Sequence, residues 1–210
     1  CTFSFYIGHH MTTIEGGMIS TNNSELFHLM KTKRSHGMLR DFDATKREDY
    51  IAKYPEIDPS FFFITTGYNF RNHEWPAYLG CLQLQSLDKY IAIRNRNFLA
   101  FQEVLTGFSD HLLQPKYVEG ISSFCLPFLL KDNSFKPTLE AALRKEGIEF
   151  RPIIGGNLLK HPFLEKYAKN SNINFPNADF VHNNGLYIGN NQFVTLKNVR
   201  SIDALLKKVF

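Results

Sequence analysis

The chain has 210 residues, of which 43% are hydrophobic and 14% aromatic, with 20 phenylalanines. This length and composition predict one large or two small domains with a filled core, and they argue against a disordered chain. The net charge of +4 suits an anionic ligand. No basic run is interleaved with aromatic residues, so we expect no nucleic-acid partner.

The cysteine pattern and the length of the apolar runs indicate in which cellular compartment the protein works and which kinds of site it can form. Cys1, Cys81 and Cys125 are odd in number, far apart, and form no CxxC motif. This spacing is typical of a reduced cytosolic chain and provides neither a disulfide framework nor a zinc site. The sequence shows no signal peptide and no apolar run of transmembrane length. We therefore expect a cytoplasmic protein with no membrane partner and no bound metal.

The first part of the chain predicts two short strands and three helices. Residues 3–6 have the pattern of a short buried strand, and residues 17–21 have that of a second strand, whose glycines allow close backbone approach. Ser24 is expected to cap a helix that runs to Ser35 and stops at Gly37. Residues 38–62 are polar and broken by prolines, which predicts an excursion with one short helix near 46–53. Apolar residues then recur at helical spacing, which predicts one long helix from 72 to about 105.

The composition changes after Gly107. Strands are predicted over 121–130 and 149–154, with a helix over 137–145 between them. A last helix is expected over 199–209, capped by Asn198. The alternation of strands and helices predicts the α/β class. We expect two domains, residues 1–106 with the long helix as a bridge, and residues 107–210.

Four sequence segments carry the chemical information. The first is Phe3-Ser4-Phe5-Tyr6-Ile7-Gly8-His9-His10-Met11, which leads to Glu15-Gly16-Gly17. The others are Gly67-Tyr68-Asn69-Phe70-Arg71, Gly155-Gly156-Asn157-Leu158, and Tyr187-Ile188-Gly189-Asn190. In this order they resemble the motifs of DegT-type sugar aminotransferases, which use pyridoxal 5'-phosphate. The resemblance covers nearly the whole chain.

The resemblance implies a fold and an incomplete chain. It predicts the C-terminal portion of a type I aspartate-aminotransferase-like fold, with the end of the large cofactor-binding domain followed by the small α/β domain. Family members have a roughly equal length of chain upstream of this region. We therefore expect the 210 residues alone to expose part of the large-domain core and to lack a complete cofactor pocket.

His9 stands where the family has its Schiff-base lysine. An imidazole cannot form the imine that a lysine amine forms with the cofactor aldehyde, but it can still move protons. The substitution resembles the dehydratase branch of the family. It implies removal of the C3 hydroxyl from a nucleotide-linked 4-keto-6-deoxy sugar, with GDP-4-keto-6-deoxymannose as the expected substrate in 3,6-dideoxysugar biosynthesis for O-antigen lipopolysaccharide. L-glutamate would restore the pyridoxamine 5'-phosphate form. Residues 31–62 contain no cysteine, which argues against the branch with an iron–sulfur cluster.

The first segment provides three candidate site residues. By the resemblance, the Ser4 hydroxyl binds the cofactor phosphate, although a serine there can also satisfy a backbone group. His9 would be the acid and base, with His10 beside it in contact with substrate. On a strand these two side chains would face opposite sides, so only one would reach the cofactor. Loop polarity or a metal are the alternatives, but no third ligand at regular spacing supports a metal.

One asparagine, three arginines and one glutamate provide the remaining candidates. Asn69 and Arg71 lie two apart on an extended stretch, and the resemblance implies that they reach across a homodimer interface into the neighbouring active site. There Asn69 would contact the cofactor phosphate and Arg71 a substrate carboxylate. Arg40 resembles an arginine that holds the amino donor. Glu149 and Arg151 would close over the sugar. Ordinary surface charge is the alternative for the last three residues.

Two other functions remain open on the sequence. A nucleotide-sugar aminotransferase would need a lysine within reach, and none occurs between Cys1 and Met30. The chain can also be a catalytically incomplete fragment of either enzyme.

Overall fold

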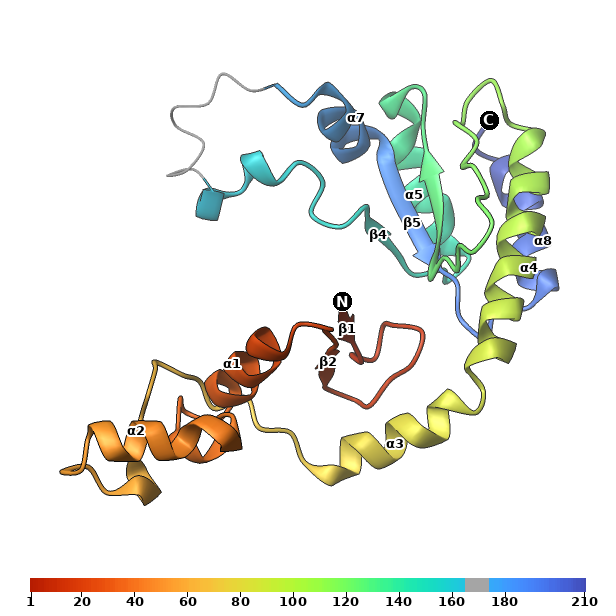
Figure 1. Ribbon diagram of the computed structural model, residues 1–210. Helices are drawn as coiled ribbons and strands as arrows, with labels where there is room; N and C mark the ends of the chain where they lie inside the picture. Colours follow the sequence, from red (N-terminus) through yellow and green to blue (C-terminus); the bar gives the residue numbers. More distant parts are fainter. Residues whose placement is uncertain (165–173) are drawn as a thin grey trace. The chain divides into compact units, whose positions relative to one another are not determined.

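The computed structural model describes residues 1–164 and 174–210, which form two compact units, Cys1–Gln85 and Ser86–Phe210 (Figure 1). Helices and strands alternate along the chain, which agrees with the predicted α/β class. The units divide at residues 85 and 86, whereas the sequence suggested a domain boundary at 106 and 107. How the units correspond to the domains of the whole protein remains a prediction.

The first unit contains one hairpin and three helices. Strand β1 (Thr2–Ser4) pairs antiparallel with β2 (Gly17–Ile19), so that Phe3 lies opposite Met18. Helices α1 (Ser24–Arg34), α2 (Arg47–Lys53) and α3 (Glu74–Leu84) follow. Both strands are exposed, so the prediction that the first strand is buried is wrong. The reason is that the sheet has only these two strands within the described residues, and no element there covers it on both faces.

Helix α1 is closed at both ends by specific hydrogen bonds. Its cap is Asn23 and not the predicted Ser24, because the Asn23 Oδ1 atom accepts the Leu26 N–H at 2.9 Å. At the other end, Gly37 has a φ of 79° and donates its N–H to the Thr32 carbonyl at 2.9 Å. The left-handed turn after the helix begins at His36, with a φ of 66°, and continues at Gly37, so the predicted stop at Gly37 lies at the second residue of this turn.

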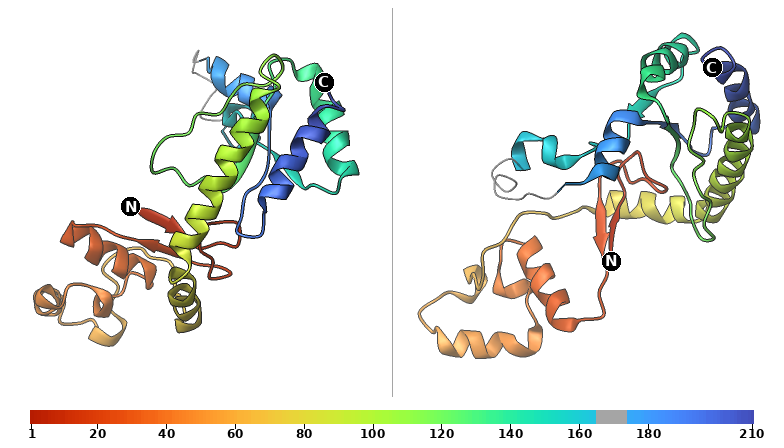
Figure 2. Two further views of the ribbon diagram at one scale, coloured as in Figure 1. Left: turned by 90° about the vertical axis from the view of Figure 1, so that its right-hand side faces the viewer. Right: turned by 90° about the horizontal axis from the view of Figure 1, so that it is seen from above.

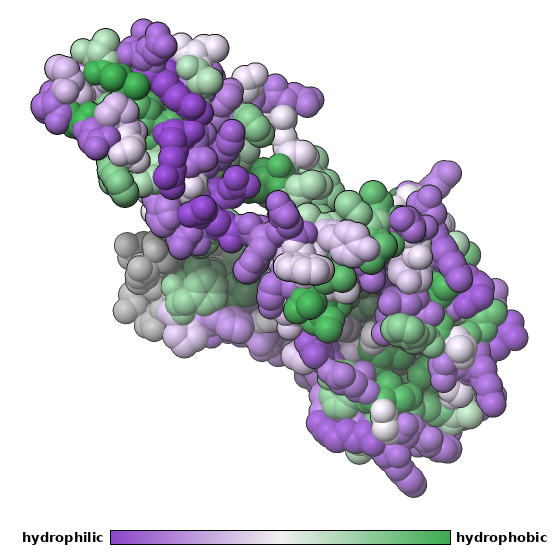
Figure 3. Space-filling model, turned by 90° about the horizontal axis from the view of Figure 1, so that it is seen from below, coloured by the Kyte–Doolittle hydropathy of each residue, from purple (hydrophilic) through white to green (hydrophobic). Residues whose placement is uncertain are grey.

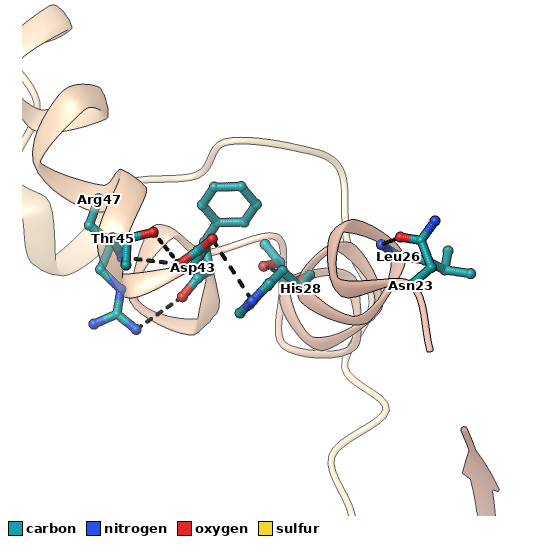
Figure 4. A network of polar contacts seen from close by, with 8 residues as sticks. Asn23, Leu26, His28, Asp43, Thr45 and Arg47 are labelled. Carbon is teal, nitrogen blue, oxygen red and sulfur yellow. Dashed lines mark hydrogen bonds and ion pairs between the residues drawn. The ribbon is translucent and has the colours of Figure 1, made fainter. Parts of the chain in front are cut away.

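The loop after α1 is attached to that helix through Asp43 (Figure 4). The Asp43 carboxylate lies 3.9 Å from His28 Nε2 and accepts the Thr45 hydroxyl at 2.7 Å and the Thr45 N–H at 3.0 Å. These two hydrogen bonds from Thr45 favour the charged form and lower the pKa of Asp43. Arg47 Nη2 donates to the Phe42 carbonyl at 3.1 Å. The polar excursion is thus an ordered layer beside α1.

The predicted long helix is in fact two helices. Helix α3 ends at Leu84, and α4 (Leu87–Thr106) begins after Gln85 and Ser86. The Tyr90 N–H donates to the Ser86 carbonyl at 3.0 Å, which opens the second helix. No glycine or proline marks the break in the sequence, and the apolar spacing continues across it. The prediction of one helix is therefore wrong, because the periodicity of apolar residues cannot detect the break at residues 85 and 86.

The second unit packs helices against a three-stranded antiparallel sheet (Figure 2). The strand order is β3 (Cys125–Leu129), β5 (Gly185–Gly189), β4 (Phe150–Pro152). The helices are α4, α5 (Lys136–Lys145), α7 (Pro176–Asn184) and α8 (Leu196–Leu206). The core joins α4, α5 and α8 to β3 and β5, and the rings of Phe101 and Phe128 meet edge to face at 5.1 Å. Strands β3 and β4 and helices α5 and α8 match predicted elements, whereas α7 and β5 were not predicted.

Asn190 holds this unit together where β5 ends. It is 1% exposed, and its Nδ2 donates to the carbonyls of Arg94 at 3.0 Å and Ser123 at 2.9 Å. Its Oδ1 accepts from Asn97 Nδ2 at 3.2 Å, and its backbone carbonyl accepts from Arg94 Nε at 3.2 Å. One buried side chain therefore connects helix α4, the end of β5 and the approach to β3.

Helix α8 begins earlier than predicted. Thr195 is its cap: the Thr195 hydroxyl accepts the Asn198 N–H at 3.2 Å, and Asn198 Oδ1 accepts the Thr195 N–H at 3.0 Å. This is a reciprocal capping box, so Asn198 is the third residue of the helix and not its cap.

Among the described residues, no helix has the length and apolarity that crossing a membrane requires.

Candidate functional site

Ser4 and His9 lie together in the loop that follows β1. Ser4 is the last residue of the strand, and its Oγ accepts the Tyr6 N–H at 3.4 Å. The His9 N–H donates to the Tyr6 carbonyl at 3.0 Å, and the rings of His9 and Tyr6 meet edge to face with centroids 6.4 Å apart. Both Ser4 and His9 are exposed. The fold therefore presents a hydroxyl and an imidazole to the surface of one short loop.

His10 is placed differently from the strand arrangement that the sequence suggested. The Thr13 N–H donates to the Phe5 carbonyl at 2.8 Å, which closes residues 5–13 into a loop. His9 and His10 are in this loop and not on a strand, so the prediction that strand geometry separates them is wrong. His9 is exposed, and His10 is half-buried.

The segment that carries Asn69 and Arg71 is fixed by its backbone. The Tyr68 N–H donates to the Lys33 carbonyl at 2.6 Å, and the Phe70 N–H donates to the Arg34 carbonyl at 3.0 Å. The rings of Tyr68 and Phe70 stack at 4.9 Å. These contacts dock the segment on the end of α1 and leave Asn69 and Arg71 exposed.

A cavity of about 1300 Å³ lies within the first unit, and we call it the basic groove. It is lined by the hairpin, α1, the segment around residue 70 and α3. Its apolar lining includes Phe3, Met18, Phe27 and Trp75, and its cationic lining comprises Lys31, Lys33, Arg34 and Arg71. Of the predicted site residues that lie in this unit, Arg71 lines the groove, whereas Ser4, His9, His10, Arg40 and Asn69 do not.

The remaining candidates belong to other elements than the loop of His9. Arg40 is in a 3-10 turn, Leu39–Asp41, where its Nε lies 3.7 Å from Asp41 Oδ2 and its side chain is half-exposed. In the second unit, Arg151 Nη2 and Nε donate to Glu149 Oε1 at 2.9 and 3.2 Å. Glu149 and Arg151 thus form an exposed pair beside β4.

The sequence reasoning missed most of the basic groove. Trp75 is 76% exposed, and Lys31 and Arg34 line the same surface. Lys31 and Arg34 come from α1 and Trp75 comes from α3, so no local sequence pattern joins these side chains. The groove forms where the hairpin and α1 meet the segment around residue 70 and α3, and the sequence alone could not locate that contact between distant segments.

The loop of His9 suits a phosphate-bearing cofactor better than a metal. The Ser4 hydroxyl accepts the Tyr6 N–H, and its own proton has no acceptor among the described residues, so it can donate to a phosphate oxygen. Asn69 presents an amide on an exposed, backbone-fixed segment. Within residues 1–164 and 174–210, no three side chains of histidine, cysteine or acid converge as metal ligands.

Comparisons with known proteins identify the family. The profile of the DegT/DnrJ/EryC1/StrS aminotransferase family matches residues 1–207. The GDP-4-keto-6-deoxy-D-mannose 3-dehydratase of Escherichia coli O55:H7 is 33% identical over 211 residues, which cover 98% of this chain and 54% of that protein. The structure of the E. coli enzyme with bound hydrated PLP matches with a TM-score of 0.85 at 30% identity, covering 98% of this chain and 53% of that one.

A second structure, of GDP-4-keto-6-deoxymannose-3-dehydratase with a trapped PLP-glutamate geminal diamine, matches with a TM-score of 0.82 at 32% identity, over 98% of this chain and 54% of that one. The chain spans about half the length of the relatives that it matches. The fold is that of the pyridoxal-phosphate aminotransferases, as predicted. The 210 residues belong to the DegT/DnrJ/EryC1/StrS aminotransferase family.

Proposed function

We propose that the whole protein is a pyridoxal-phosphate-dependent 3-dehydratase of a nucleotide-linked 4-keto-6-deoxy sugar, with GDP-4-keto-6-deoxymannose as substrate. The observation that carries the proposal is His9, which lies one short turn after Ser4 in a family member related to the E. coli GDP-4-keto-6-deoxy-D-mannose 3-dehydratase. A histidine there retains proton transfer and loses imine formation. The pathway is 3,6-dideoxysugar biosynthesis in the cytoplasm.

The residues of the first unit divide the work between binding and proton transfer. When bound, the cofactor supplies an electron sink. The Ser4 hydroxyl donates to its phosphate, and Asn69 does the same from the neighbouring subunit of a homodimer. The His9 imidazole takes up one proton and delivers one to the C3 oxygen of the sugar, so that water leaves instead of hydroxide. The exposure of His9 supports this role, because the ring is open to a ligand.

The other charged side chains have binding roles in this proposal. Arg40 holds the carboxylate of L-glutamate, the amino donor, and Arg71 grips a carboxylate or phosphate in the neighbouring site. His10 contacts the substrate beside His9. Glu149 and Arg151, already paired on an exposed surface, contact the sugar.

The test is to replace His9 by asparagine in the whole protein and to measure the 3-deoxy-4-ketosugar by mass spectrometry, with glutamate and pyridoxal phosphate supplied. Loss of a general acid–base group lowers the rate by about 10²- to 10⁴-fold. His73→Asn, at another exposed histidine of the first unit, is the matched control and keeps the rate. An unchanged rate in His9→Asn would refute the proposal. A 4-aminosugar as the product of the natural sequence would establish the aminotransferase instead.

A further inference from the structure

Helix α7 is attached through Asn157 to the chain segment that follows β4, residues 153–160, which we call the β4 turn. Asn157 is 7% exposed, and its backbone N–H donates to His182 Nδ1 at 3.3 Å while its Nδ2 donates to Asp179 Oδ1 at 2.9 Å. Its Oδ1 accepts the Leu159 N–H at 3.0 Å, and its carbonyl accepts the Lys160 N–H at 3.1 Å. Asp179 and His182 are three residues apart and therefore lie on one face of α7. Both side chains thus bind the same asparagine of the turn.

The imidazole of His182 lies directly against Gly156. This glycine has a φ of 62°, and a Cβ atom added there would overlap His182 Nδ1 and lie 2.8 Å from His182 Cγ. Gly155 also has a positive φ, of 65°, but a Cβ atom there would meet Leu158 Cδ2 at 3.2 Å and not the imidazole. The second glycine of the segment Gly155-Gly156-Asn157-Leu158 therefore leaves the space that the histidine ring occupies.

The hydrogen bond from Asn157 requires a neutral His182. Because Nδ1 accepts an N–H, the proton of the neutral ring is on Nε2. A protonated imidazole carries a proton on both nitrogens and accepts no hydrogen bond. Histidine is the side chain whose charge ordinarily changes between pH 5 and 8. A second histidine at the turn behaves differently: His161 Nε2 lies 2.8 Å from the Gly155 carbonyl, to which it donates, and a protonated ring keeps that bond.

Three charged side chains face His182 from the elements around it: Asp179 on α7, Lys160 from the β4 turn and Lys136 from α5. Hydrogen bonds from Lys160 and Asn157 hold the pKa of Asp179 below 3.8, so this carboxylate stays charged over the range in which a histidine titrates. Asp179 belongs to the same helix as His182, so it attracts a protonated imidazole whether or not the turn is docked. Lys136 Nζ donates to the His182 carbonyl at 3.5 Å, and a lysine is charged throughout this range. The bond from the Asn157 N–H is therefore the contact that protonation of His182 removes.

Burial distinguishes this contact from ordinary surface charge. Hydrophilic side chains are interspersed with hydrophobic ones on the face shown in Figure 3. A charged group that is open to solvent contributes little to stability, because water screens its interactions. His182 and Asp179 are half-buried, however, and Asn157 is buried. Removing a hydrogen bond from a buried amide has a measurable cost, because the amide has no water in place of its lost partner.

We propose that Asn157 and His182 form a pH-sensitive latch that docks the β4 turn on α7. With His182 neutral, the latch is closed. When Nδ1 takes up one proton from solvent, the bond from the Asn157 N–H breaks and the turn is released, and loss of that proton restores the bond. Because the open state binds the additional proton, the latch is closed at high pH and opens as the pH falls.

The latch acts on the chain directly after β4, the strand that contains Arg151. Its existence rests on contacts within the second unit. Only its effect on Arg151, to which the proposed function assigns a contact with the sugar, depends on that function. The experiment that follows measures the turn itself and not the reaction, so failure of the latch and failure of the proposed function are separate results.

The test is residue-resolved hydrogen exchange of the whole protein at pH 5 and pH 8, in the natural sequence and in His182→Asn. Asparagine places an acceptor oxygen where the histidine has Nδ1, and it takes up no proton in this range. Dividing the two rates at each pH cancels the intrinsic pH dependence of amide exchange. At pH 8 the Asn157 amide should exchange equally in both proteins. At pH 5 it should exchange about fivefold faster in the natural sequence, the ratio that corresponds to one ordinary hydrogen bond.

Two pairs of variants make the test specific. His182→Leu provides no acceptor and should leave the Asn157 amide fast at both pH values, whereas His161→Gln keeps a donor at the position of Nε2 and should retain the natural pH dependence. Gly156→Ala displaces the ring and should open the latch already at pH 8. Gly155→Ala has a similar positive φ without that overlap and should leave the latch closed.

Three results would overturn the inference. The first is equal exchange of the Asn157 amide in the natural sequence and in His182→Asn at pH 5. The second is a pH dependence that His161→Gln abolishes, which would assign the effect to the other histidine. The third is an equal acceleration at Phe128, a buried residue of β3, because the whole second unit would then loosen in acid.

Discussion

Asn190→Ala should destabilise the second unit by about 3 kcal/mol. The substitution removes three hydrogen bonds, two of them buried and one partly buried, each worth about 1 kcal/mol. Asn97 keeps its bond to the Val194 carbonyl at 2.9 Å, and the Arg94 carbonyl keeps its helical partner. The Ser123 carbonyl, in a partly buried setting, loses the bond from Asn190 Nδ2. The bond from Arg94 Nε to the backbone of residue 190 is unaffected.

The assay is urea unfolding of the whole chain, followed by far-ultraviolet circular dichroism and by tryptophan fluorescence in the same samples. Trp75 is the single tryptophan and lies in the first unit, so its signal reports whether the change stays within the second. Asn191→Ala is the matched control, because that exposed side chain accepts one hydrogen bond, from the Phe193 N–H at 2.9 Å. It should cost less than about 1 kcal/mol. Equal effects of the two substitutions would refute the reasoning.

Three further outcomes follow from local features. In urea unfolding, Gly37→Ala should destabilise the first unit by about 2 kcal/mol more than Gly120→Ala destabilises the second unit. Both glycines have a positive φ, but only at Gly37 would the added Cβ atom meet backbone atoms. Equal costs for the two substitutions would contradict this reasoning. Burial raises the pKa of the Cys125 thiol, so a thiol reagent at pH 8 should modify it more slowly than the two exposed cysteines, and equal rates would show that β3 opens. Hydrogen bonds from Lys160 and Asn157 lower the pKa of Asp179 below its ordinary 3.8, so Asp179→Asn should be less stable than the natural sequence above that pH. This difference should disappear as the pH falls through the lowered value, and a difference that persists in acid would exclude the linkage.

The sequence predicted those elements whose signals are local. Helix α1 ended close to the predicted stop at Gly37, because a glycine after a basic last turn is a strong local stop signal, and the left-handed turn there already begins at His36. Helix α5 appeared within one residue of its predicted start, with a proline in its first turn. The caps of α1 and α8 were misplaced because Asn23 and Thr195 compete with nearby residues of equal capping preference, and only geometry chooses between them.

The rest depended on contacts between distant residues. The break at Ser86 has no helix-breaking residue, and β5 was missed because its strand role depends on pairing with both β3 and β4. The candidate site was predicted only as motifs. The sequence placed Ser4 and His9 near each other, but the docking of residues 68–70 on α1 joins segments more than thirty residues apart. No periodicity could reveal that contact.

The docking of that segment has a consequence for how the family diversifies. Tyr68 and Phe70 are attached to α1 through main-chain atoms, and His36 donates its N–H to the Tyr68 carbonyl at 2.8 Å. Main-chain bonds do not depend on which side chains the segment carries. Positions 69 and 71 can therefore mutate without moving the path of the loop, so ligand preference can evolve there while the scaffold is inherited unchanged.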